Sequence, residues 1–252
     1  MKRTLIASAL ALGLHAGTAA AADFPVAPAG PPWAPLPITW TGFYIGVNGG
    51  GARSDNTATY AVTSGFASAS FTDTSAIGGA QVGFNWQMAS LVVGVEIDVD
   101  GRNWSRSATS APMAGNAIDL VTLSQTENWF GTVRGRLGVA FGDALFYATG
   151  GAAAGEVEHG FTEFRTTTGE TRSLIDSPTR VGWVVGAGAE YRVWRNVSVG
   201  VEYLHIDLGN TTLINDASTV GTLAFPTSQA TFTDRSDIVR ARLNWLFGGA
   251  AY

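Results

Sequence analysis

Apolar side chains occupy every second position near the end of the chain, from Val239 to Phe247. The first three of the four positions between them hold Arg240, Arg242 and Asn244. A period of two is typical of a β-strand, with one face that could lie in lipid and one that carries charge. The same alternation also fits a soluble sheet. It becomes informative only if other segments repeat it under constraints that a soluble sheet does not need.

The N-terminus has the composition of a secretory signal. Lys2 and Arg3 precede an apolar run from Leu5 to Leu14, and small residues follow up to Ala22. This order predicts a signal peptide over residues 1–22 and export of the chain. Six prolines in residues 23–39 then predict an extended Pro-rich periplasmic tail rather than a core element. Residues 40–252 remain for a single β-domain.

Charge and cysteine content exclude several classes of protein. The chain has 15 basic residues against 20 carboxylates, and no cysteine. The balance is acidic, so nothing favours nucleic acid as a partner, and disulfides and thiolate metal sites are excluded. Beyond the signal no apolar run reaches about 18 residues, which argues against a transmembrane helix. A chain of this kind could span a membrane only as a closed β-barrel.

Eight segments show strand-like alternation. They are residues 42–53, 75–86, 91–104, 128–141, 145–158, 180–192, 197–208 and 237–247. About ten tilted residues cover the roughly 25 Å apolar band of an outer-membrane barrel. Three connections, 87–90, 142–144 and 193–196, are short, whereas those near 54–74, 105–127, 159–179 and 209–236 are long and rich in Ser, Thr, Ala and Gly. Short turns at one rim and long outward loops at the other are typical of an eight-stranded antiparallel up-and-down transmembrane barrel.

Aromatic residues gather beside the short turns. We expect an aromatic girdle at the periplasmic membrane surface that contains Trp86, Phe141, Tyr147, Tyr191, Trp194, Trp245 and Phe247. Phe43 and Tyr44 lie at the same end of the first segment. A sparser second set, Trp104, Trp129, Trp183 and Tyr203, is expected at the outer surface of the membrane.

Charges of both signs recur on the face opposite the apolar one. The expected lumen network consists of Glu96, Asp98, Arg134, Arg136, Glu190, Arg192, Glu202, Arg240 and Arg242. Because eight strands enclose a space only wide enough for side chains, these groups should pair and fill the lumen. Unpaired charges in a confined interior would be strongly unfavourable. A conducting path gated by the same pairs is the alternative.

Several stretches resemble the alphaproteobacterial outer-membrane immunogenic or porin-like β-barrel family, within the OmpA-like and opacity-like group of eight-stranded barrels. The matching stretches are Trp40 to Gly50, Gly131 to Gly138, Tyr147 to Gly151, Gly188 to Tyr191 and Val239 to Phe247. The resemblance implies a Gram-negative outer-membrane location, contact with membrane lipid and insertion by the barrel-assembly machinery. Members of the family are described as surface antigens, envelope scaffolds, porins or, in some cases, haem-binding proteins. It says little about biochemical activity. Barrels of this group commonly end on an aromatic residue, and here Gly248 to Tyr252 follow Phe247.

No catalytic, metal or cofactor site is predicted. Two histidines follow the signal, His159 and His205, and the His-x-Ser spacing of outer-membrane lipid A deacylases is absent because residue 207 is aspartate. We expect a non-enzymatic envelope-structural or surface protein with a plugged lumen and long extracellular loops. A narrow small-solute porin is one alternative. The other is a surface binder of a host ligand or of haem, held for example by His159, His205 or Tyr60.

Overall fold

The computed structural model describes residues 39–62, 65–110, 120–164, 169–176, 179–216, 218–220, 223–225 and 227–247. The expected signal peptide and nearly all of the expected Pro-rich tail lie outside these ranges, so both remain predictions. Within the described part of the chain no helix is long and apolar enough to cross a membrane.

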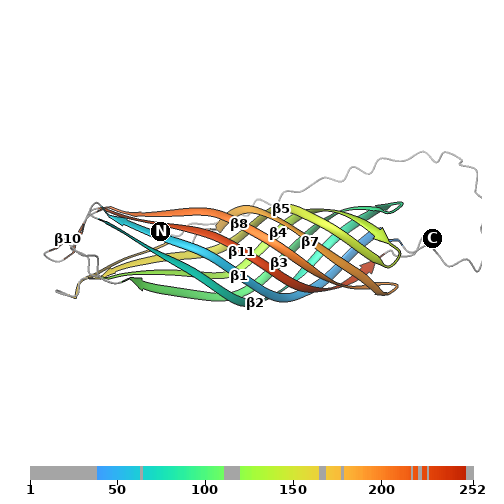
Figure 1. Ribbon diagram of the computed structural model, residues 1–252, viewed down its shortest axis with the longest axis horizontal. Helices are drawn as coiled ribbons and strands as arrows, with labels where there is room; N and C mark the ends of the chain where they lie inside the picture. The colour runs from blue at the N-terminus through green and yellow to red at the C-terminus, as the bar shows by residue number, and fades with distance from the viewer. Residues whose placement is uncertain are drawn as a thin grey trace, which may run out of the picture. The chain divides into compact units, whose positions relative to one another are not determined.

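The described residues form β-strands almost throughout. The strands are β1 (Gly42–Val62), β2 (Gly65–Met88), β3 (Leu91–Ser110), β4 (Leu120–Phe141), β5 (Ala144–Phe164), β6 (Thr171–Asp176), β7 (Thr179–Trp194), β8 (Val197–Asn215), β9 (Ser218–Val220), β10 (Leu223–Phe225) and β11 (Ser228–Phe247). Strands β9 and β10 pair only with each other. The long strands wind around a common axis (Figure 1).

The sheet closes on itself. Its order is β4-β3-β2-β1-β11-β8-β7-β5, and β4 also pairs with β5. Every pairing is antiparallel, and β6 continues the wall beyond β7 by pairing with β5. The eight-stranded antiparallel barrel predicted from the sequence is therefore confirmed.

Three tight turns lie at one end of the barrel, here called the short-turn end. They join β2 to β3, β4 to β5 and β7 to β8. Gly142 in the second turn has a φ of 59°, a left-handed conformation that glycine adopts without strain. Ala89 in the first turn has a φ of 54°, a left-handed conformation that is sterically unfavourable for a residue with a Cβ atom. These turns confirm the positions predicted from the sequence.

The strands extend much further than predicted at the other end, here called the far end. β1 runs to Val62 and β2 starts at Gly65, so residues 54–62 and 65–74 belong to two paired strands and the expected long loop there is wrong. β3, β4, β5, β8 and β11 likewise reach well into the segments expected as loops. Ser and Thr on the outer face made these segments look like loops, although threonine fits a strand well.

The polarity of the wall inverts along the strands. Near the short-turn end, β1 exposes Phe43, Ile45 and Val47 on its outer face, whereas further along it exposes Arg53 and Asp55. Beyond this level the interior becomes apolar. It contains a cluster of Ala58, Tyr60, Val121, Leu123, Phe161, Leu213, Ala230 and Phe232. The first half is therefore built for lipid outside and charge inside, and the second half for water outside and an apolar core inside.

Candidate functional site

The interior of the lipid-facing half holds a dense group of charged side chains, here called the ion-pair network. Its members are Glu96, Asp98 and Asp100 on β3, Arg134 and Arg136 on β4, Glu190 on β7, Glu202 on β8, and Arg240 and Arg242 on β11. All of them are buried. The alternation of each strand positions them, because every second side chain points into the lumen.

Glu202 lies at the centre of the network and contacts three arginines. Its oxygens lie 3.0 Å from Nη1 of Arg134, 2.7 Å from Nη2 of Arg240 and 2.7 Å from Nη1 of Arg242. Three positive charges around one carboxylate would be unfavourable alone. The network therefore needs the further carboxylates that the same arginines contact.

Those carboxylates come from β3. Arg134 pairs with Glu96 and, at 2.7 Å, with Asp98, and Arg240 pairs with Asp100, also at 2.7 Å. Arg242 pairs with Glu96 as well as with Glu202. The arginines thus bridge strands on different sides of the ring, and the lumen is crossed by charge-assisted hydrogen bonds.

Within the network, Arg136 connects Glu96 to Glu190, which lies nearer the short-turn end. Its Nη2 donates to Glu190 at 2.5 Å. The other oxygen of Glu190 accepts from Ser198 at 3.0 Å and from Asn244 at 3.1 Å. Asn244 in turn accepts from Gln81 at 2.8 Å, so neutral amides fill the space left by the ions.

Two tyrosines belong to this interior. The Tyr44 hydroxyl donates to Glu96 at 2.5 Å, and the Tyr147 hydroxyl donates to Glu202 at 2.9 Å. The Arg136 guanidinium lies 3.9 Å from the centroid of the Tyr147 ring, a cation–π contact. The assignment of Tyr147 to the aromatic girdle is therefore wrong, and Tyr44 also points inward. Proximity to a turn suggested the outer surface, but strand parity decides the direction.

Arg192 lies apart from the ion-pair network to which the sequence assigned it. Its Nη2 donates to the carbonyl oxygen of Thr39 at 2.7 Å, and its guanidinium lies 4.6 Å from the centroid of the Trp40 ring. It is two residues nearer the short-turn end than Glu190. Its side chain therefore lies at the mouth of the barrel and not among the ion pairs.

Two further inward-facing residues contact the network although the expected set leaves them out. Asp100 shares the inward face of β3 with Glu96 and Asp98, and Tyr44 shares that of β1 with Asn48. The period of two that identified Glu96 also places Asp100 on the inward face, whereas the aromatic pattern assigned Tyr44 to the girdle.

A second polar layer lies further along the lumen, towards the far end. Arg102 donates to Glu127 at 2.6 Å and to three serine hydroxyls, those of Ser54, Ser75 and Ser236, at 2.7, 2.8 and 3.1 Å. Between this layer and the ion-pair network lies an apolar cluster that includes Phe130 and Ile238. Polar and apolar layers therefore alternate along the axis.

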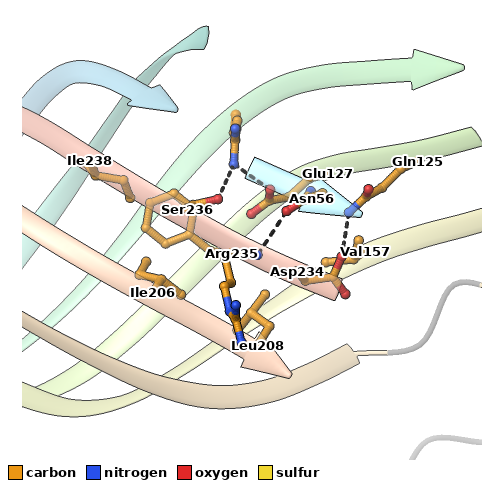
Figure 2. A pocket seen from close by; sticks show the side chains of 12 residues that line it. Asn56, Gln125, Glu127, Val157, Ile206, Leu208, Asp234, Arg235, Ser236 and Ile238 are labelled. Atoms are coloured by element: carbon orange, nitrogen blue, oxygen red, sulfur yellow. Dashed lines mark hydrogen bonds and ion pairs between the residues drawn. The ribbon is translucent and has the colours of Figure 1, made fainter. Parts of the chain in front are cut away.

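Asp234 completes the second polar layer from the β11 side. Its Oδ1 accepts from Gln125 at 2.5 Å (Figure 2). The same oxygen lies 3.1 Å from Nε2 of His159. The cavity beside these residues has a volume of about 10 Å³ and is also lined by Asn56 and Glu127. That volume admits about one water molecule.

The two histidines lie on different sides of the wall. His159 is fully buried, contacts Asp234 and packs against Phe232 with ring centroids 4.6 Å apart. His205 faces outward on β8 and pairs with Asp237 at 2.8 Å. The structure does not bring these two candidate ligands together. Among the described residues there is also no group of three His, Cys, Asp or Glu side chains that could hold a metal ion.

The remaining residues expected in the girdle lie on the outer surface near the short-turn end. They are Trp86, Phe141, Tyr191, Trp194, Trp245 and Phe247, all exposed. At the opposite edge of the apolar band, Trp129, Trp183 and Tyr203 are also exposed.

A closed antiparallel barrel with an apolar outer band and a charged interior defines the class of transmembrane β-barrels. The family model described as "Outer membrane protein beta-barrel domain" matches residues 6–223, and the chain belongs to this family. It is an outer-membrane protein of the Gram-negative type.

Relatives and a solved structure agree with this assignment. The chain is 35% identical over 238 residues to the 31 kDa outer-membrane immunogenic protein of Brucella melitensis, covering 85% of this chain and 90% of that protein. It is 32% identical over 193 residues to a 22 kDa outer membrane protein of Rhizobium leguminosarum, covering 74% and 69%. The structure of OprG from Pseudomonas aeruginosa matches with a TM-score of 0.50 at 12% identity, covering 82% of this chain and 97% of that one, a likeness of fold alone.

Proposed function

We propose that this protein is a non-enzymatic surface protein of the outer membrane. Its lumen is closed by side chains, and its far half presents the hairpin rim to the exterior. The contact of Glu202 with Arg134, Arg240 and Arg242 carries the proposal, because it lies at the centre of a network that crosses the lumen.

Physical reasons favour closure over conduction. Each arginine of the ion-pair network has at least one carboxylate partner, and the side chains of Arg134, Arg240, Arg242, Glu96 and Glu202 have no exposed surface. Separating them to admit a hydrated ion would leave buried charges without partners, at a cost of several kcal/mol per charge. In an eight-stranded barrel the wall leaves little room for an alternative path.

The direction of insertion follows from the turns. In outer-membrane barrels short turns face the periplasm and long hairpins face outward. Trp86, Phe141, Tyr191, Trp194, Trp245 and Phe247 would then form the periplasmic girdle. On β1, about ten residues follow Ala52, which at about 3.3 Å per residue and a tilt of about 40° extend roughly 25 Å beyond the lipid.

This geometry supports a role in presentation. A wall that continues beyond the membrane and encloses its own apolar core, with Tyr60, Phe161 and Phe232, holds the far ends of the strands away from the lipid surface. These ends are then available for an extracellular ligand. Relatives named as outer-membrane immunogenic proteins, among them those of Brucella, agree with exposure at the surface.

The alternatives have less support. Haem ligation by both histidines is disfavoured because His159 is buried in the lumen and His205 faces outward. A hydrolytic role is disfavoured because the lumen carboxylates are engaged by arginines. A narrow porin would require the ion-pair network to open.

Release of small solutes from vesicles tests the proposal. Lipid vesicles that contain the purified protein and a trapped sugar should retain the sugar as well as protein-free vesicles do. The Glu96→Ala variant removes a carboxylate that faces Arg134 and Arg242 and is expected to leak. Rapid release by the unmodified protein would instead support the porin.

A further inference from the structure

The residues that lead into β1 make contacts that the ion-pair network does not explain. Trp40 precedes the first strand and is nevertheless fully buried, with contacts to several strands around the barrel. We propose that Trp40 is a stopper that closes the short-turn mouth of the lumen, and that Arg192 clamps it there. This deepens the proposed closed lumen by adding a second barrier in series with the first.

Hydrogen bonds tie Trp40 to two separate parts of the rim. Its backbone N–H donates to Oε1 of Gln87 near the end of β2, at 2.7 Å. Its indole N–H points to the carbonyl oxygen of Gly142, in the turn between β4 and β5, at 3.4 Å. In the sheet order β1 and β5 are four strands apart in a ring of eight, so the side chain reaches across the mouth.

Arg192, which lies on β7, holds Trp40 in place. Its guanidinium lies 4.6 Å from the centroid of the Trp40 ring and donates to the Thr39 carbonyl oxygen at 2.7 Å. One side chain thus contacts both the ring and the backbone that carries it. The cation–π contact and the charge-assisted hydrogen bond therefore act together to hold Trp40 in place.

The interior surface behind Trp40 completes the closure. Trp40 packs in a cluster with Tyr44, Val92, Ala140, Leu145, Tyr147 and Leu246. The hydroxyls of Tyr44 and Tyr147 point on to Glu96 and Glu202. An apolar floor therefore separates the ion-pair network from water at the short-turn end, which strengthens the ion pairs by keeping their surroundings poorly polarisable.

The absence of cysteine from the chain allows a direct test by thiol labelling. Ala140→Cys places a reporter in the floor cluster with little change in volume, and Ser90→Cys places an exposed control in the turn between β2 and β3. The full-length protein in detergent micelles is treated with a charged maleimide. We expect Ser90→Cys to react quickly and Ala140→Cys to react at least tenfold more slowly.

Substitution of Trp40 or Arg192 should then make the thiol at position 140 more accessible to the maleimide. Trp40→Ala is expected to raise the labelling rate of Ala140→Cys at least tenfold, and Arg192→Met should raise it by a smaller factor. Trp245→Ala is the matched control, because this tryptophan faces outward at the same end, and it should leave the rate unchanged. Folding of each variant is checked by heat-dependent migration in detergent gels.

Equal rates for the unmodified, Trp40→Ala and Arg192→Met backgrounds would overturn the proposal, as would an equal increase with Trp245→Ala. If Trp40→Ala does not fold, the Arg192→Met result alone decides. The closed-lumen proposal fails separately: sugar release by the unmodified protein in vesicles would contradict it, whereas the labelling rates concern only the short-turn mouth.

Discussion

At the scale of residues, the charges in the lumen depend on one another. Glu202 has three arginine partners, and each of those arginines contacts a carboxylate on β3. Pairing of this kind stabilises little relative to apolar packing, but the loss of one member leaves an uncompensated buried charge. The network therefore constrains the relative positions of β3, β4, β8 and β11.

Removal of the central charge should be costly. We expect Glu202→Gln to lower the free energy of unfolding by about 3–5 kcal/mol, because Arg134, Arg240 and Arg242 lose their common partner. Urea unfolding in micelles measures this change. Glu156→Gln is the control: Glu156 accepts a hydrogen bond from Trp129 on the outer face, and its change should stay below about 1 kcal/mol. Similar losses for both variants would argue against a network centred on Glu202.

Tyr60 gives a prediction about pH in the far half of the barrel. Burial, and then the hydrogen bond to Glu163, raises the pKa of Tyr60 above its usual range. An unfolded tyrosine ionises near pH 10. Above that pH the folded state therefore binds more protons than the unfolded state, and the free energy of unfolding falls as pH rises.

The Tyr60→Phe variant removes this contribution. Its free energy of unfolding should decline less between about pH 9 and 11 than that of the unmodified protein. The comparison uses urea unfolding at several pH values. Parallel pH profiles for the two proteins would show that Tyr60 keeps an ordinary pKa in the fold.

Residue-level predictions from sequence were accurate where strand parity was used. Parity on β3, β4, β8 and β11 assigned Glu96, Arg134, Glu202 and Arg240 to the inner face, and the structure has them there. It was not applied to Tyr147, which was assigned from its closeness to a turn. Arg192 shares the inward parity but lies at the mouth, and its contact with Trp40 depends on a residue outside the strands.

At the scale of elements, the main difference between expectation and structure is strand length. The lipid-facing half of each strand has the apolar outer face that a membrane requires, and sequence alternation located it. In the far half the outer face is Ser- and Thr-rich, and pairs such as Ser105 with Thr126 and Thr109 with Thr122 form hydrogen bonds across strands. Beyond the lipid the outer face is polar and the inner face is apolar. Apolar outer faces, which identify the strands in the sequence, therefore end at the membrane surface.

Cysteine labelling on intact cells tests the extended hairpin of β1 and β2. Thr59→Cys lies on the outer face of β1, and Ala58→Cys lies in the inner apolar cluster. A membrane-impermeant maleimide should label Thr59→Cys and leave Ala58→Cys nearly unlabelled, because neighbouring residues of a strand face opposite sides. Equal labelling at both positions would indicate an irregular loop, as the sequence first suggested.

At the scale of the whole molecule, the lumen is a stack of layers. From the short-turn end these are the floor with Trp40, the ion-pair network, the apolar cluster with Phe130, the second polar layer with Asp234, and the apolar cluster with Tyr60. The sequence indicated the barrel, its antiparallel order and the charged interior. The later layers depend on contacts among five or more strands, which spacing within one strand does not predict.

If these layers close the barrel, the protein does not conduct ions, and electrical recording on a planar lipid bilayer measures this. The purified full-length protein should give no steady unitary current over the background of the bare bilayer. Glu96→Ala combined with Trp40→Ala, which weakens both the ion-pair network and the floor, should give measurable openings. Steady unitary currents from the unmodified protein that change in size with Arg134→Ala would contradict the account and identify the lumen as a pore.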